Sequence, residues 1–167
     1  MHRYKSFNGP APTTAAQAAV TTNTVIETLL QIATPATRQL QIISWGFSLD
    51  DPPGADSVIE LLQTDVAATV TAHVAAGVPS LDPNAPASLL TLGTANTGYT
   101  ASVEGSTTAT RVFDVQFLAA SSPPNLSYSY QWTPAERPII PISKFVRVRT
   151  TFAATTTSLV CWICWDE

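Results

Sequence analysis

TSLVCWICWD, residues 157–166, has the β-branched and aromatic composition of a β-strand. Successive side chains of a strand point to opposite faces, so this stretch divides into two rows. One row holds Leu159, Cys161, Ile163 and Trp165, and the other holds Val160, Trp162 and Cys164. Both rows are apolar, whereas a sandwich strand needs only one apolar face for its own core. We therefore expect the second row to contact another subunit or, alternatively, the chain's own loops or N-terminal segment.

Seven further segments show strand signals and are separated by turn residues or prolines. They are residues 24–32, 39–49, 57–63, 99–104, 110–119, 127–132 and 144–152. Short helical turns are expected at residues 64–68 and 87–92, in a long connection across the end of the strands. The pattern predicts an all-β fold with one domain over residues 24–167. A two-sheet antiparallel β-sandwich of the jelly-roll type fits best, and an immunoglobulin-like sandwich is the alternative.

Residues 1–23 differ from the rest of the chain, because they are rich in Pro, Thr and Ala and mostly polar. Such a segment offers little apolar surface to bury and is expected to be an extended N-terminal arm. It would be held on its own domain, on a sister subunit or on a larger scaffold. The residues expected to make contact with a partner are Arg3, Tyr4, Lys5 and Phe7.

Charge is sparse, since charged residues make up 12% of the chain and the formal net charge is −4. Nucleic-acid binding needs clustered Lys and Arg, which the sequence lacks, so no nucleic-acid partner is expected. A weakly charged polar surface instead suits close contact with other protein. In the strand over residues 144–152, the residues expected on the outer face, and hence in a subunit interface, are Phe145, Arg147 and Arg149.

Neither a membrane span nor a signal peptide is expected, because no apolar run is long enough and none follows the basic N-terminus. The chain is therefore expected to be made and used without secretion. Cys161 and Cys164 are three residues apart on a strand, with Cα atoms about 10 Å apart. A disulfide needs Cα atoms within about 7 Å, so two reduced, buried cysteines are predicted.

Catalytic equipment is not evident in the sequence. His2 and His73 have no Cys or Glu at metal-ligand spacing, and no phosphate-binding loop or nucleophile motif occurs. The sequence predicts neither an enzyme nor a cofactor or metal site. One row of aromatic rings, Tyr128, Tyr130 and Trp132, allows two interpretations. It could be a stacking surface for sugar rings, or it could be core or subunit packing, which is favoured because large rings supply much buried area.

Four segments show a family resemblance: WGFSLD at 45–50, TDVAATVTAH at 64–73, SKFVRVR at 143–149 and CWICWDE at 161–167. Over roughly residues 39–167 the chain resembles small structural proteins from the head gene clusters of tailed phages of actinobacteria. The resemblance implies a capsid decoration (cement) or minor capsid protein, often a trimeric jelly roll at three-fold positions of the head.

Under that resemblance the partners would be the major capsid protein and further copies of the chain. The protein would be made in the host cytoplasm and would lie on the capsid exterior, with the N-terminal arm gripping the shell. A carbohydrate- or receptor-binding module on the virion, using the aromatic row, is the alternative.

Overall fold

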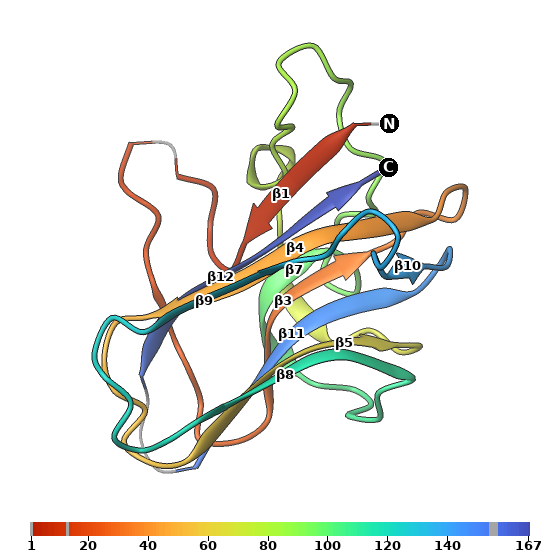
Figure 1. Cartoon of the computed structure of the whole chain (residues 1–167). Coiled ribbons are helices and arrows are strands. Elements are labelled where there is room, and N and C mark those ends of the chain that lie inside the picture. The colour runs from red at the N-terminus through yellow and green to blue at the C-terminus, as the bar shows by residue number, and fades with distance from the viewer. Residues whose placement is uncertain (1, 13, 154–156) are drawn as a thin grey trace.

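The computed structural model describes residues 2–12, 14–153 and 157–167, and its strands form two antiparallel sheets packed against each other (Figure 1). Sheet A contains β1 (Arg3–Phe7), β2 (Val20–Thr21), β4 (Leu40–Leu49), β9 (Ser127–Gln131), β10 (Ile139–Ile140) and β12 (Ser158–Asp166). Sheet B contains β3 (Glu27–Ala33), β5 (Ser57–Thr64), β6 (Thr69–Ala72), β7 (Gly98–Val103), β8 (Arg111–Leu118) and β11 (Phe145–Phe152). The predicted all-β two-sheet sandwich is confirmed, and its jelly-roll connectivity stays a prediction.

All eight predicted strands are present, with bounds within three residues of those expected from the sequence. The two predicted helical turns are wrong, and the one helical turn of the described chain is a 3-10 turn at Ala75–Gly77. Residues 64–68 instead lead from β5 into β6. The Gln31 side chain holds them there, accepting a 2.8 Å hydrogen bond from the Ala68 amide and donating a 3.3 Å bond to its carbonyl.

The core lies between the two sheets. The row of β12 predicted to face inward is confirmed, because Leu159, Cys161, Ile163 and Trp165 are all fully buried there. Val146 and Val148 meet this row from sheet B. Cys161 and Cys164 are both free and buried, as predicted, and their side chains project from opposite faces of β12. Burial raises the pKa of the Cys161 thiol, so it stays protonated at neutral pH.

In each sheet a strand from the C-terminal part of the chain lies between two strands from the N-terminal part. β11 lies between β3 and β5, and β12 lies between β1 and β4. The termini meet at one end of the sandwich, where His2 and Glu167 exchange backbone hydrogen bonds of 3.0 and 3.1 Å (Figure 1). Neither sheet is complete until the C-terminal strands are in place, so the fold is dominated by long-range contacts.

The described part of the N-terminal segment lies on its own domain, which was one of the three expected locations, and it contributes two strands to sheet A. β1 pairs with β12 over its whole length. Its Tyr4 is 1% exposed and stacks on Trp165 at 6.1 Å between ring centroids. Apart from β2, the described part of residues 8–23 is irregular, which fits the extended character that was expected. β1 was not predicted as a strand because its segment is polar. As an edge strand it is held by backbone hydrogen bonds to β12 and by the buried Tyr4 ring.

Candidate interaction surface

The outer face of sheet A has a row of one residue from each of four neighbouring strands. Phe7 of β1 lies opposite Trp162 of β12, Trp162 lies opposite Gly46 of β4, and Gly46 lies opposite Ser129 of β9. Because Cys161 and Ile163 point into the core, the Trp162 between them points outward. We call the outer surface of these four strands the β1–β12 face.

Trp162 lies directly over Gly46. An ideal Cβ at Gly46 would sit 2.4 Å from Cζ2 of the Trp162 ring and 2.5 Å from the Tyr128 carbonyl oxygen. Real Cβ atoms do not approach other atoms so closely. The glycine therefore gives the indole room to pack against the sheet, which is a recurrent reason for glycine inside a strand.

Phe7 and Lys5 complete the cluster around the indole. The Phe7 and Trp162 rings are 6.4 Å apart and tilted by 50°. The Lys5 Nζ lies 4.7 Å from the Phe7 ring centroid and 4.8 Å from that of Trp162. Such cation–π contacts stabilise exposed sites by about 0.5–1 kcal/mol. All three side chains remain half-buried, so the cluster keeps part of its apolar surface in contact with solvent.

Small polar side chains surround this cluster on the side of β9. They are the half-buried Ser44 and Ser48 and the exposed Ser127, Ser129 and Gln131. Cys164 lies at the β1 side, opposite Lys5, and burial raises the pKa of its thiol. Two aromatic rings bordered by uncharged polar groups are typical of a protein-binding patch, in which aromatic residues are enriched, and Lys5 adds one positive charge at the centre.

Two sets of residues singled out separately in the sequence meet on this face. Lys5 and Phe7 were expected to contact a partner, and Val160, Trp162 and Cys164 were expected at a subunit interface. Pairing of β1 with β12 places all five on one surface. Arg3 and Tyr4 are the other two arm residues that were expected to contact a partner. Arg3 is exposed and forms a 2.9 Å ion pair with Asp82. Tyr4 as a contact residue is wrong, because the same pairing turns it into the core.

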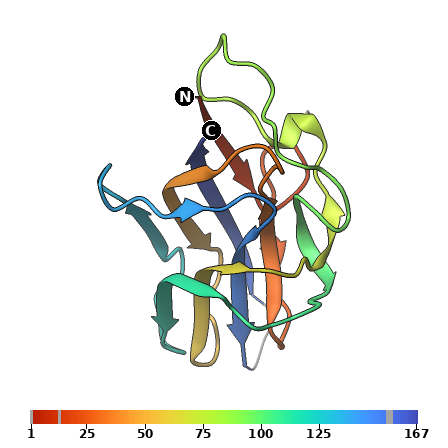
Figure 2. The ribbon, with the colours of Figure 1, turned by 90° about the vertical axis from the view of Figure 1, so that its right-hand side faces the viewer.

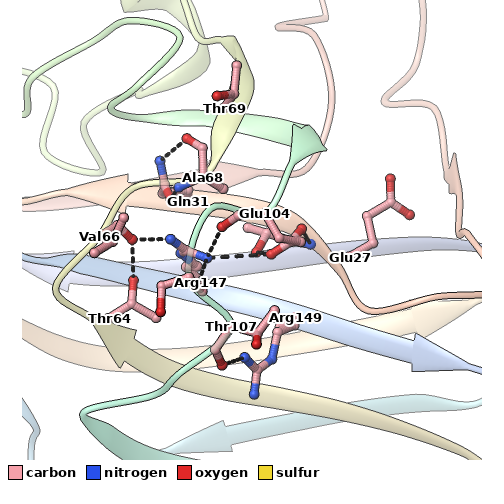
Figure 3. A network of polar contacts seen from close by, with 12 residues as sticks. Glu27, Gln31, Thr64, Val66, Ala68, Thr69, Glu104, Thr107, Arg147 and Arg149 are labelled. Carbon is pink, nitrogen blue, oxygen red and sulfur yellow. Dashed lines mark hydrogen bonds and ion pairs between the residues drawn. The ribbon is translucent and has the colours of Figure 1, made fainter.

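The outer face of sheet B behaves differently from the expected subunit interface. Arg147 of β11 is 0% exposed and Arg149 is buried, while Phe145 is half-buried. The segments that cover the two arginines belong to the same chain and are residues 64–68 and 104–107 (Figure 3). Their assignment to a subunit interface is therefore wrong.

A polar network fills the space under these segments (Figure 3). The Arg147 guanidinium donates to the carbonyls of Glu104 at 3.1 Å, Ser106 at 3.4 Å and Val66, and lies 3.4 Å from the Glu104 carboxylate. Burial lowers the pKa of Arg147, against the opposing effect of the Glu104 charge. Arg149 forms a second ion pair at 3.0 Å with Glu60 of β5. The network holds two loops onto the sheet and leaves the arginines no free donor surface for a partner.

The aromatic row of β9 does not form an open stacking surface. Tyr128 packs against Trp45 and Phe47, and its hydroxyl donates a 2.6 Å hydrogen bond to Asp114 of the opposite sheet. The Asp114 carboxylate also accepts a 3.0 Å bond from Trp45 Nε1. Trp132 is buried, and Tyr130 meets it edge-on at 5.0 Å. Asp114, which joins the two sheets here, was not recognised in the sequence, where it is one acid in an apolar strand.

One serine–histidine pair lies within the molecule. Ser6 Oγ is 3.2 Å from His73 Nε2, which also lies 3.0 Å from the Phe7 carbonyl oxygen. Ser6 Oγ donates to the Gly77 carbonyl at 2.9 Å, and both side chains are buried. The Ser6 hydroxyl is thus already bound and is not exposed to a substrate. The geometry suits a link between β1 and residues 73–77.

Among the described residues, no group of three or more His, Cys, Asp or Glu side chains is placed to hold a metal ion. The described part of the chain also has no helix long and apolar enough to cross a membrane. Comparisons with protein-family models, with curated proteins and with solved structures found no match to this chain. Function must therefore be argued from the surface and from the residues themselves.

Proposed function

We propose that this protein is a structural virion protein that binds the outside of a phage capsid and stabilises the shell, as a trimer at three-fold positions. The β1–β12 face is the observation that carries the proposal. It presents Phe7, Lys5 and Trp162 within a border of serines and glutamine, and the surface as a whole carries little charge. The resemblance of residues 39–167 to phage head proteins selects the partner, the major capsid protein.

Binding to the assembled shell, and not to loose subunits, accounts for the stabilising effect. A protein that binds only the assembled state stabilises it by about 2.7 kcal/mol per site at a hundredfold excess over the dissociation constant. Many sites on one shell add up, and three linked copies reinforce one another's attachment. Such a role needs a rigid sandwich with one face that binds the shell, and it needs no catalytic group.

The test is a binding assay with phage heads that lack the protein, taken from a tailed actinobacterial phage. Purified chain is added and the bound copies are counted after sedimentation. Lys5→Glu reverses the charge at the centre of the face, and we expect its binding to fall by roughly tenfold or more, as for loss of an interface hot spot. Lys144→Glu is the matched control, because Lys144 directly precedes β11 of the other sheet and pairs with Asp65.

Heads decorated by the wild type and by Lys144→Glu, but not by Lys5→Glu, would support the proposal. A release temperature of packaged DNA that rises with occupancy would support the stabilising role. Full occupancy by Lys5→Glu would exclude the β1–β12 face as the contact, and absence of binding by the wild type would refute the capsid function.

A further inference from the structure

β8 is one of the two edge strands of sheet B and lies at the lower margin of the sandwich in Figure 1 (see also Figure 2). It pairs with β5 on one side from Arg111 to Leu118. No strand of the described residues lies on its other side. An edge strand presents unpaired N–H and C=O groups that can accept another strand.

The edge at β1 is covered by the chain itself. The Lys5 amide donates to the Pro79 carbonyl at 3.2 Å, and Leu81 donates to Arg3 at 2.7 Å. The edge at β6 is partly covered, since Val70 donates to Thr94 at 2.7 Å. For β8 no backbone hydrogen bond on the open side is present among the described residues, which makes it the long uncovered edge of sheet B.

β8 has only part of the usual protection of an edge. Natural edge strands carry Lys, Pro or inward-pointing charges, or are very short. β8 has eight residues, RVFDVQFL, without Lys or Pro. Its Arg111 is bound to Gln63 at 2.6 Å and to the Ile139 carbonyl. Its Asp114 points inward, where its carboxylate accepts hydrogen bonds from Trp45 and Tyr128 of the other sheet and is not directed at the open edge.

Apolar side chains cover the outer face of the strand. Phe117 is 81% exposed and Val112 is 51% exposed, and Val115 between them is half-buried. Phe117 is the most exposed large hydrophobic side chain of the described residues. A register shift opposite Leu61 and Leu62 interrupts the first part of β8 and leaves residues 114–118 regularly paired. This regular part is therefore the segment that another strand could extend.

We propose that residues 114–118 of β8 pair antiparallel with the same segment of a second copy, forming one continuous sheet across a two-fold axis. The segment is complementary to itself. With Gln116 facing Gln116 of the partner subunit, Val115 lies beside Phe117 of the partner subunit on the outer face. Asp114 then lies opposite Leu118 of the partner subunit, so no like charges meet.

The self-complementary register of this segment favours a second copy over an unrelated partner. The outer face of residues 114–118 offers no charge or polar side chain that a different protein could recognise, whereas an identical strand matches both its length and its apolar row. A two-fold contact of this kind is isologous, with the same patch on both subunits. The inference does not depend on the capsid proposal. On a shell, the same contact would join neighbouring trimers.

The test measures the mass of the full chain in solution over a wide range of concentrations, by light scattering after size exclusion. The mass of the wild type is expected to double as concentration rises, from monomer to dimer or, where the proposed trimer has formed, from trimer to a pair of trimers. Phe117→Lys and Val115→Lys each place a charge on the paired edge and are expected to raise the dimer dissociation constant by roughly tenfold or more. Tyr130→Lys is the matched control, since Tyr130 is 42% exposed on β9 of the other sheet.

Hydrogen exchange separates strand pairing from loose apolar contact. Amides of residues 114–118 are expected to gain protection as the wild type dimerises, and to lose that gain in Phe117→Lys. A wild type that stays monomeric at the highest concentration overturns the inference. So does an oligomer whose mass is unchanged in both β8 variants, or one in which only Tyr130→Lys dissociates. Circular dichroism confirms that each variant is folded.

Discussion

The outer face of β11 is closed by the chain's own loops, whereas the outer face of β12 is left half open. On β11, Arg147 is buried under the chain's own loops, and backbone carbonyls of residues 66, 104 and 106 accept hydrogen bonds from its two terminal nitrogens. On β12, Trp162 is covered only on the side of Gly46 and flanked by Phe7 and Lys5. The difference shows that a charged outer row can be a buried part of the fold, while an aromatic outer row can remain available to a partner.

The largest expected effect on stability comes from removing Arg147, which holds the loops over the outer face of β11. Arg147→Met removes the guanidinium, leaves the carbonyls of residues 66, 104 and 106 without this donor, and leaves the Glu104 carboxylate with hydrogen bonds from Thr28 but no counter-ion. Breaking a buried ion pair in this way costs about 3–5 kcal/mol, so the free energy of unfolding in urea should fall by that amount. Lys144→Met is the control: its 2.8 Å pair with Asp65 is partly exposed and should contribute less than about 1 kcal/mol. Equal losses in the two variants would mean that the loops do not seal Arg147.

A smaller effect on stability is expected from adding a methyl group under Trp162 on the β1–β12 face. Gly46→Ala forces a Cβ against the Trp162 ring and against the Tyr128 carbonyl, and the carbonyl cannot move without disturbing β9. Overpacking of this kind typically costs about 1–3 kcal/mol. Trp162 should also become more accessible, which quenching of its fluorescence by acrylamide can measure.

Ser48→Ala, also on β4 and on the same face, is the control for Gly46→Ala and should change the unfolding free energy little. A Gly46→Ala protein as stable as the wild type, with unchanged quenching, would show that the indole does not rest on the glycine.

Alternation in the sequence predicted the long strands well, because the period of two is a local property. It predicted the inner row of β12 and the outward direction of Trp162 for the same reason. It could not show that Arg147 is covered, since the covering carbonyls lie about 40 to 80 residues away along the chain. β1 was missed because its stability comes from pairing with β12, at the opposite end of the sequence. Deleting residues 1–23 would therefore remove Tyr4 from the core as well as a contact surface.

The smallest effect is the pH dependence of stability that comes from His73. This residue contacts β1, one of the strands of the β1–β12 face. Its Nε2 lies 3.0 Å from the Phe7 carbonyl oxygen, its ring contacts Tyr99 at 4.9 Å, and its Nδ1 is buried without a hydrogen-bond partner. Burial lowers the pKa of His73 below 6.5, against the weaker raising effect of the Phe7 carbonyl. Below about pH 6.5 the unfolded chain then binds a proton that the folded chain does not.

Stability should therefore be unaffected by His73 above pH 6.5 and should fall as the pH drops below that value, by at most about 1.4 kcal/mol per pH unit. Burial raises the pKa of Glu27, which acts in the opposite direction, so a single protein cannot isolate the histidine. The measurement is the difference between wild type and His73→Gln in urea unfolding at about pH 7.5 and about pH 5.5. His73→Gln should lose less stability on acidification. If both proteins lose the same amount, His73 is not buried as a neutral ring in the folded chain.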